Sequence, residues 1–124
     1  MIVSIVIPKP FPEQARFFKI AKRRMDDIST VAACFALDAD KSGHITKARI
    51  AYGGVAATPV RIQPAENFLL GERWNDETMQ EAQALIAAHL EPMSDHRGRA
   101  QYRLAMTQTL LWKFLLEQQE LAAQ

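Results

Sequence analysis

The sequence predicts a single α+β domain, in which an antiparallel or mixed β-sheet with a central β-hairpin packs against about three helices. Residues 28–37 and 44–52 alternate apolar and polar side chains with a period of two, which is typical of strands. Residues 38–43, which lie between them, are rich in turn-forming Asp, Ser and Gly. Beyond Pro64 the apolar residues instead recur with the spacing of helices.

The N-terminal segment predicts a strand followed by a helix. Residues 2–7 are mostly β-branched and indicate a buried strand, which the prolines of residues 8–12 end. Pro12 suits the first turn of a helix over residues 13–23, with Phe17, Ile20 and Ala21 facing inward. We therefore expect one domain over residues 1–124, with a leading strand at 1–10 and the core at 13–122.

The hairpin strands and the helices follow in order. One side of the first hairpin strand is expected to be buried, namely Val31, Ala33, Phe35 and Leu37, while Ile50 and Tyr52 share a face of the second. A short helix over residues 65–70 ends at Gly71. Asn75 is the expected N-cap of a helix that reaches Leu90 with an apolar row of Met79, Ala82, Ile86 and Leu90. Ser94 or Asp95 caps a final helix to about residue 122, whose two apolar faces predict burial between the sheet and its neighbours.

Composition excludes several classes of function. Lys plus Arg number 15 and Asp plus Glu 14, so the net charge of +1 provides no field for nucleic acid or an anionic membrane. The single cysteine, Cys34, excludes an internal disulfide and favours a reducing, cytoplasmic setting. The apolar start is too short for a membrane span or a secretory signal.

Residues 38–45 match the first eight positions of a calcium-binding loop. Such a loop requires a bidentate glutamate at its twelfth position, and this sequence has Arg49 there. The flanking segments also have the period of strands, whereas a calcium loop lies between helices. We therefore interpret these residues as a solvated hairpin turn.

Other candidate groups have simple structural interpretations. The basic run of Arg16, Lys19, Lys22, Arg23 and Arg24 is followed by acidic residues and is typical of a solvated face, although it leaves room for a small anion pocket. The histidines, at 44, 89 and 96, lack metal-binding spacing, and His89 suits the negative end of its helix. Cys34 is expected to be a buried small apolar residue rather than a nucleophile. The residues alone thus show no self-contained catalytic set.

Four ordered motifs nevertheless resemble a known family. They are Lys-Ile-Ala-Lys-Arg-Arg-Met-Asp-Asp-Ile-Ser at 19–29, Ala-Arg-Ile-Ala-Tyr-Gly-Gly-Val-Ala at 48–56, Leu-Gly-Glu-Arg-Trp at 70–74, and Ser-Asp-His-Arg-Gly-Arg-Ala-Gln-Tyr-Arg at 94–103. Together they resemble the C-terminal part of the FAD-binding subunit or domain of molybdenum hydroxylases, the xanthine dehydrogenase and carbon monoxide dehydrogenase flavoprotein group. The resemblance extends over nearly the whole chain and implies the fold of the carbon monoxide dehydrogenase flavoprotein C-terminal domain.

The resemblance also implies the cofactor and partners. In this family, Gly-rich loops of an N-terminal FAD-binding domain bind FAD, and this sequence contains no such loops. Iron–sulfur clusters and molybdopterin belong to partner subunits. The residues implied to lie near the flavin are Lys19, Arg23 and Asp26. A cation there stabilises the anionic reduced ring, and a carboxylate opposes it. Alternatively, Arg23, Asp26 and Asp27 form a local ion-pair and capping cluster.

Two functions remain open from the sequence. The chain is either the C-terminal part of the FAD-binding component of a xanthine-dehydrogenase-type hydroxylase, inactive alone, or a standalone interaction or oligomerisation module that keeps the fold without flavin. In the first case it covers FAD and aids electron transfer from iron–sulfur centres to FAD and on to NAD or oxygen. A calcium or anion sensor is a distant third.

Overall fold

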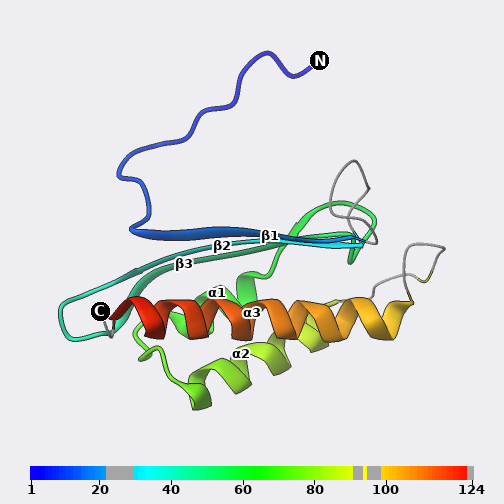
Figure 1. The fold of residues 1–124 in the computed structure, drawn as a ribbon. Coiled ribbons are helices and arrows are strands. Elements are labelled where there is room, and N and C mark those ends of the chain that lie inside the picture. Colours follow the sequence, from blue (N-terminus) through cyan, green and yellow to red (C-terminus); the bar gives the residue numbers. More distant parts are fainter. Residues whose placement is uncertain (22–29, 91–93, 95–98, 123–124) are drawn as a thin grey trace.

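A computed structural model of the chain describes residues 1–21, 30–90, 94 and 99–122. Four antiparallel strands form one sheet in the order β1-β2-β3-β4, where β1 is Gln14–Ile20, β2 is Val31–Ala39, β3 is Ile45–Gly53 and β4 is Val60–Arg61. The helices are α1 (Gln63–Leu69), α2 (Asp76–His89) and α3 (Ala100–Ala122). Figure 1 shows all three on one side of the sheet, with the N-terminal segment on the other. The predicted α+β class is confirmed.

The hairpin of β2 and β3 has the predicted alternation. Phe35 is paired with Ile50 and Ala33 with Tyr52, and these side chains face the helices. The register shifts at Asp38 and Ala39, just before the turn. The inner face of both strands is therefore the floor of the hydrophobic core, as the pattern indicated.

The predicted helix over residues 13–23 is wrong, because residues 14–20 form strand β1. They pair with β2 in an unbroken antiparallel register from Gln14–Leu37 to Ile20–Val31. Phe18 is buried against Phe35, whereas Phe17, which we expected to face inward, is 66% exposed. Pairing with an apolar neighbouring strand outweighs the local helix signal of Pro12. The end of the predicted helix at residues 22–23 lies outside the described residues, as do Asp26 and Asp27, which follow it in the sequence.

The predicted leading strand is also wrong in this structure. Residues 2–7 have no strand conformation, and Ile2, Val3, Ile5, Val6 and Ile7 are 71–87% exposed. Within the described ranges no strand lies beside this segment, so its backbone has no ladder to join. The strand propensity of the segment is real, but a strand needs a partner.

The helices agree with the sequence. Pro64 lies in the first turn of α1, and Gly71 follows that helix with φ +84°. Asn75 caps α2 by accepting a hydrogen bond from the backbone N–H of Thr78 at 2.9 Å, and the row from Met79 to Leu90 is buried. Helix α3 begins at Ala100, later than the predicted cap at Ser94 or Asp95, and the backbone N–H of Ala100 donates a 2.7 Å hydrogen bond to Ser94 Oγ.

Aromatic rings join the sheet to the helices. Phe35 in β2 contacts Phe18, Tyr52 and Phe114, with ring centroids 5.5–5.9 Å apart. The hydroxyl of Tyr52 donates a 2.8 Å hydrogen bond to the backbone oxygen of Thr107 in α3. Burial raises the pKa of that hydroxyl, so it stays protonated and remains a donor. Helix α3 is therefore fixed against the middle of the sheet.

Candidate functional site

The face of the sheet turned away from the helices is the main candidate site, and we call it the open face. Its residues follow from the strand register, in which Phe17, Cys34 and Ala51 lie side by side across three strands. No described helix lies over it (Figure 1). The open face comprises Ala15, Phe17 and Lys19 of β1, Ala32, Cys34, Ala36 and Asp38 of β2, and Lys47, Arg49, Ala51 and Gly53 of β3.

A shallow apolar hollow of about 240 Å³ lies on the open face. It is lined by Phe17, Ala32, Cys34, Ala51, Gly53 and Pro59, among others. The prediction that Cys34 is buried is wrong, because its side chain is exposed in this hollow. Small side chains on the adjacent strands β2 and β3 form the floor of this hollow, and the exposed ring of Phe17 on β1 lines its side.

The N-terminal segment meets the opposite end of the same face. Ile7, Pro8, Pro10 and Pro12 line a hollow of about 160 Å³ together with Ala36, Lys47 and Arg49. The backbone N–H of Glu13 donates a 2.6 Å hydrogen bond to Asp38 Oδ1. The chain leading into β1 is therefore fastened to the open face rather than to the helices.

The structure places one of the three predicted flavin-contacting residues. Lys19 lies on the open face, where it pairs in register with Ala32 near the end of β1. Arg23 and Asp26 lie outside the described residues, in the stretch that joins β1 to β2. The base of that stretch is closed by a 2.6 Å hydrogen bond from the backbone N–H of Thr30 to the oxygen of Ile20. Lys19 therefore lies next to Ile20, whose backbone oxygen takes part in this hydrogen bond.

A junction beside this base was not recognised from the sequence. Arg103 of α3 is buried and donates a hydrogen bond from Nη1 to the backbone oxygen of Gly54. Gly54 has φ +80°, and a Cβ atom placed on it would lie 2.5 Å from the backbone oxygen of Thr30. The backbones of Thr30 and Gly54 therefore approach so closely that only glycine, which has no Cβ atom, fits at position 54.

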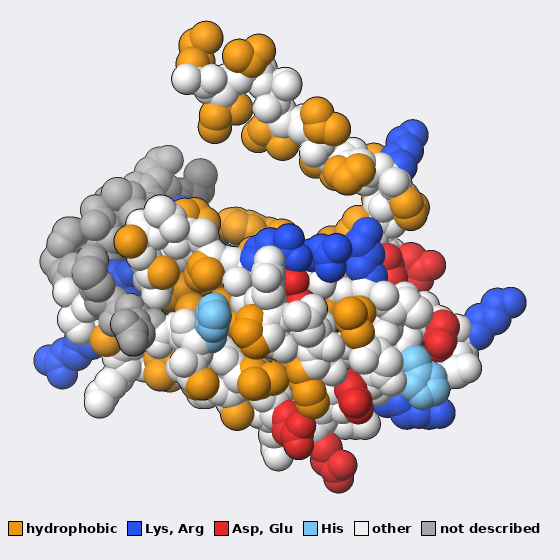
Figure 2. Space-filling model, turned by 180° about the vertical axis from the view of Figure 1, so that it is seen from behind, with side chains coloured by type: hydrophobic (Ala, Val, Ile, Leu, Met, Phe, Trp, Pro, Cys, Tyr) orange, Lys and Arg blue, Asp and Glu red, His pale blue; other side chains and the backbone are white. Residues whose placement is uncertain are grey.

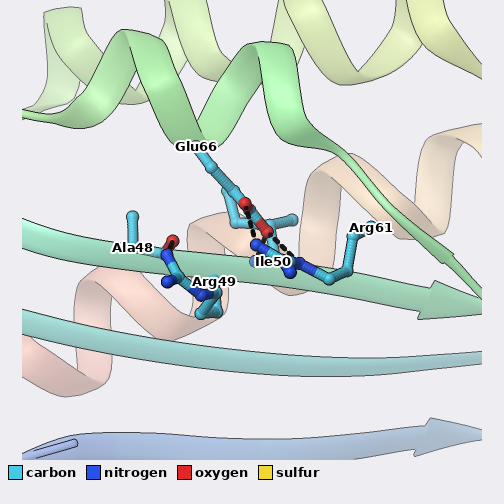
Figure 3. Close-up of polar contacts among 5 residues, drawn as sticks. All are labelled: Ala48, Arg49, Ile50, Arg61 and Glu66. Atoms are coloured by element: carbon cyan, nitrogen blue, oxygen red, sulfur yellow. Dashed lines mark hydrogen bonds and ion pairs between the residues drawn. The ribbon is translucent and has the colours of Figure 1, made fainter.

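A second polar cluster links α1 to the edge of the sheet (Figure 3). Glu66 is buried and accepts the backbone N–H of Ile50 at 2.9 Å, and it also accepts Arg61 Nη2 at 2.7 Å. Burial alone would raise the pKa of Glu66, but the hydrogen bonds from Arg61 and Ile50 outweigh it and lower that pKa. The cluster is structural, because it satisfies a strand N–H that no β-ladder reaches, and the sequence pattern gave no sign of it.

The calcium-like segment forms a hairpin turn. Asp40 Oδ1 accepts the backbone N–H groups of Ser42 and His44, both at 2.9 Å, and strands flank the turn on both sides. The hydrogen bond from the His44 backbone is the main cause that lowers the pKa of Asp40. Within the described part of the chain, no group of three or more His, Cys, Asp or Glu side chains could hold a metal ion.

The remaining candidates are dispersed. Arg16 forms an ion pair with Glu117 of α3 at 2.8 Å, while Lys22, Arg23 and Arg24 of the basic run lie outside the described residues. His89 ends α2, as expected, and His96 lies outside the described residues. Among the helices that the structure describes, none is long and apolar enough to cross a membrane.

Comparison with known sequences identifies related proteins. The sequence pattern of the CO dehydrogenase flavoprotein C-terminal domain matches residues 16–118. Xanthine dehydrogenase of Blastobotrys adeninivorans is 35% identical, over 92% of this chain and 9% of the relative. The xanthine dehydrogenase FAD-binding subunit of Escherichia coli O157:H7 is 30% identical, over 92% of this chain and 41% of the relative. The chain therefore spans less than half the length of these curated relatives.

Solved structures share the fold. CO dehydrogenase from Oligotropha carboxidovorans matches with a TM-score of 0.72 and 31% identity, over 78% of this chain and 33% of that chain. Quinoline 2-oxidoreductase from Pseudomonas putida 86 matches with a TM-score of 0.72 and 29% identity, over 83% of this chain and 35% of that chain. In both cases the similarity covers about a third of the solved chain.

Proposed function

The chain belongs to the family of CO dehydrogenase flavoprotein C-terminal domains, and on this premise we propose that it is the C-terminal part of the FAD-binding component of a xanthine-dehydrogenase-type molybdenum hydroxylase. In this role it covers the flavin and is not catalytic alone. The observation that carries the proposal is the open face, an uncovered surface on which Lys19 lies beside an apolar hollow.

The described residues fit a cover over FAD better than an enclosure for it. The hollow of about 240 Å³ is below the roughly 300–1,000 Å³ of pockets that enclose a small molecule. Its lining is apolar, and the cationic group that the open face offers nearby is Lys19. FAD, when bound, supplies the electron and hydride chemistry. The chain's own contribution is to exclude water from one side and to present cationic and acidic side chains.

The proposed flavin-contacting residues are Lys19, Arg23 and Asp26. The ammonium group of Lys19 favours negative charge on a nearby ring, because opposite charges attract strongly where water is excluded. Arg23 and Asp26 follow Lys19 in the sequence by four and seven residues. The cation-to-carboxylate balance in this stretch then tunes the reduction potential of the flavin.

The proposal extends to partners and location. Iron–sulfur and molybdopterin subunits would supply electrons, which pass through FAD to NAD or oxygen. The E. coli relative is named as an FAD-binding subunit, which supports a division of cofactors among subunits. The exposed thiol of Cys34 favours a reducing, cytoplasmic compartment.

A standalone interaction or oligomerisation module is the alternative function. The 66% exposure of Phe17 on an apolar face favours association with another surface, whether or not flavin is involved. The two functions differ in their need for FAD, which can be measured directly.

Titration of the isolated chain with FAD tests the first part of the proposal. We expect no binding tighter than micromolar, because the described residues form a cover without a phosphate cradle. Flavin fluorescence quenching would report binding, and a submicromolar Kd would contradict the proposal.

Substitution of Lys19 tests the flavin contact in a complete flavoprotein. This chain would replace the matched region of the E. coli FAD-binding subunit, and Lys19→Ala would be compared with Lys41→Ala in the exposed hairpin turn. We expect Lys19→Ala to lower the flavin reduction potential and the flavin content, because negative charge on the ring loses a nearby cation. Equal potentials and flavin contents in the two variants would dismiss the role of Lys19.

A further inference from the structure

The two faces of the sheet differ sharply in exposure. On the inner face Val31, Phe35 and Tyr52 are 0–1% exposed beneath the helices, whereas on the open face Phe17 is 66% exposed and Cys34 is exposed. Sheets with small apolar residues on a flat face pack well against another layer. Exposed apolar patches of this kind mark surfaces that a partner covers.

The charges around the open face are mainly positive. Lys19 lies at one end, and Lys47 and Arg49 lie at the other, whereas Asp38 is its acidic residue. Asp38 already accepts the backbone N–H of Glu13. Figure 2 shows basic side chains gathered on the body of the molecule beneath the N-terminal segment. A partner that fits this face therefore combines an apolar centre with acidic side chains at its rim.

The path of the chain indicates where such a partner lies. The N-terminal segment runs on the open side of the sheet (Figure 1), and its prolines line a hollow with Ala36, Lys47 and Arg49. The family is named for a C-terminal domain, and the E. coli relative carries more than half of its length outside the match. In a protein built like that relative, the preceding part reaches this domain from the open side. Ile7 also lines this hollow, and the other apolar residues of segment 2–7 are exposed.

We propose that the open face is the docking surface for the flavin-binding portion of the flavoprotein, which contacts it through an apolar patch with an acidic rim. The inference rests on the proposed function and names the surface through which it operates. Docking covers Phe17 and Cys34 and places Lys19 at the border between the two parts. The helices then remain on the outer side.

Cys34 provides a direct reporter, because it is this chain's single cysteine and lies in the centre of the open face. Its rate of reaction with N-ethylmaleimide would be measured by peptide mass spectrometry in the isolated chain and in the E. coli chimera. We expect labelling at least ten times slower in the chimera. Equal rates in folded, FAD-containing chimera would overturn the proposal.

A matched pair of substitutions tests the surface itself. Ala51→Glu adds a carboxylate to the centre of the open face, and Ala84→Glu makes the same change on the exposed surface of α2. We expect Ala51→Glu to restore Cys34 labelling in the chimera to within threefold of the isolated chain, while Ala84→Glu leaves it slow. The reverse result, or equal protection in both, would overturn the proposal.

Alternatively, a second copy of the chain covers the open face. Sedimentation of the isolated chain distinguishes a monomer from a dimer, and it does not require the chimera to fold. A monomer with reactive Cys34 supports the proposal, whereas a dimer with protected Cys34 that Ala51→Glu dissociates overturns it. The flavin readout stays separate. If Cys34 is labelled slowly in the chimera and Lys19→Ala changes neither the flavin potential nor the flavin content, only the flavin contact is rejected. If Cys34 is labelled as fast as in the isolated chain but Lys19→Ala lowers the potential and the flavin content, only the docking surface is rejected.

Discussion

At the scale of single residues, Gly54 and Arg103 show how close contacts hold the end of β3. The positive φ of Gly54 and its nearness to the Thr30 carbonyl leave no room for a side chain, and Nη1 of Arg103 donates a hydrogen bond to the Gly54 oxygen. The junction lies where β2 begins, directly after the stretch that carries Arg23 and Asp26. Its backbone geometry therefore sets where that stretch returns to the sheet.

Gly54→Ala is expected to lower the free energy of unfolding by about 3 kcal/mol, from an unfavourable positive φ and overlap with a backbone carbonyl. Gly43→Ala is the control, because Gly43 has φ +87° but nothing within 4 Å of a Cβ atom. It should cost only about 1 kcal/mol. Urea denaturation followed by circular dichroism measures both, and equal losses would show that the Thr30 contact is unimportant.

Prediction from sequence at this scale succeeded only where a residue type has one common use. Asn75 as a helix cap and Gly71 as a helix end were both correct, because few side chains accept the first N–H groups of a helix and few residues other than glycine adopt a positive φ. Lys19 was proposed for the site only through the resemblance; the structure places it on the open face, and its flavin contact stays a prediction. Arg103 was missed as a contact, because its partner lies 49 positions away and no local pattern records it.

At the scale of elements, the contact between α1 and β3 depends on a buried carboxylate. Glu66 binds the N–H of Ile50 and the side chain of Arg61, so one helix residue ties two strands together. An alanine at this position would leave the Ile50 N–H without its side-chain acceptor, at a cost of about 1–3 kcal/mol. A glutamine keeps an oxygen for that N–H and removes only the charge.

The lowered pKa of Glu66 predicts a specific pH dependence. Since the folded-state pKa lies below the ordinary value of 4.5, the stabilisation is present above that value and is lost as pH falls through the folded-state pKa. Unfolding free energies measured from about pH 6 to pH 3 should therefore fall more steeply in the original chain than in Glu66→Gln. Parallel curves for the two proteins would contradict this assignment.

The elements themselves were predicted well where periodicity was unambiguous. Strand β2 alternates from Val31 to Leu37, β3 alternates from Ala48 to Tyr52, and α2 repeats its apolar row over four positions, so each pattern favours one interpretation. Residues 14–20 contain apolar residues at 17, 18 and 20, which fit both a helix and a strand. Pairing with β2 decides between helix and strand, and the sequence of residues 14–20 alone does not indicate that pairing.

At the scale of the whole molecule, one aromatic cluster joins the two layers. Phe35 lies between the rings of Phe18, Tyr52 and Phe114, which come from β1, β3 and α3. The layered architecture was predictable, because a β-hairpin pattern is followed by segments with the apolar spacing of helices. The exposed second face was not, since alanines on a strand are compatible with either environment.

Phe35→Ala is expected to cost about 3–5 kcal/mol, because it empties the centre of the core. That is a large part of the roughly 5–15 kcal/mol that stabilises a typical domain. Phe17→Ala, on the open face, should change the stability of the isolated chain by less than about 1 kcal/mol. Thermal and urea unfolding compare the two, and a large loss for Phe17→Ala would show that the open face is covered in the isolated chain.

The dependence of the sheet on α3 has a consequence for biosynthesis. All four strands leave the ribosome before the 23 residues of this last helix, which brings Phe114 and the acceptor for Tyr52. Until then the part of the inner face that α3 covers, around Phe35, remains exposed in addition to the open face. Translation that stops before residue 100 would therefore release an aggregation-prone chain with exposed apolar surface, which chaperones and proteases recognise.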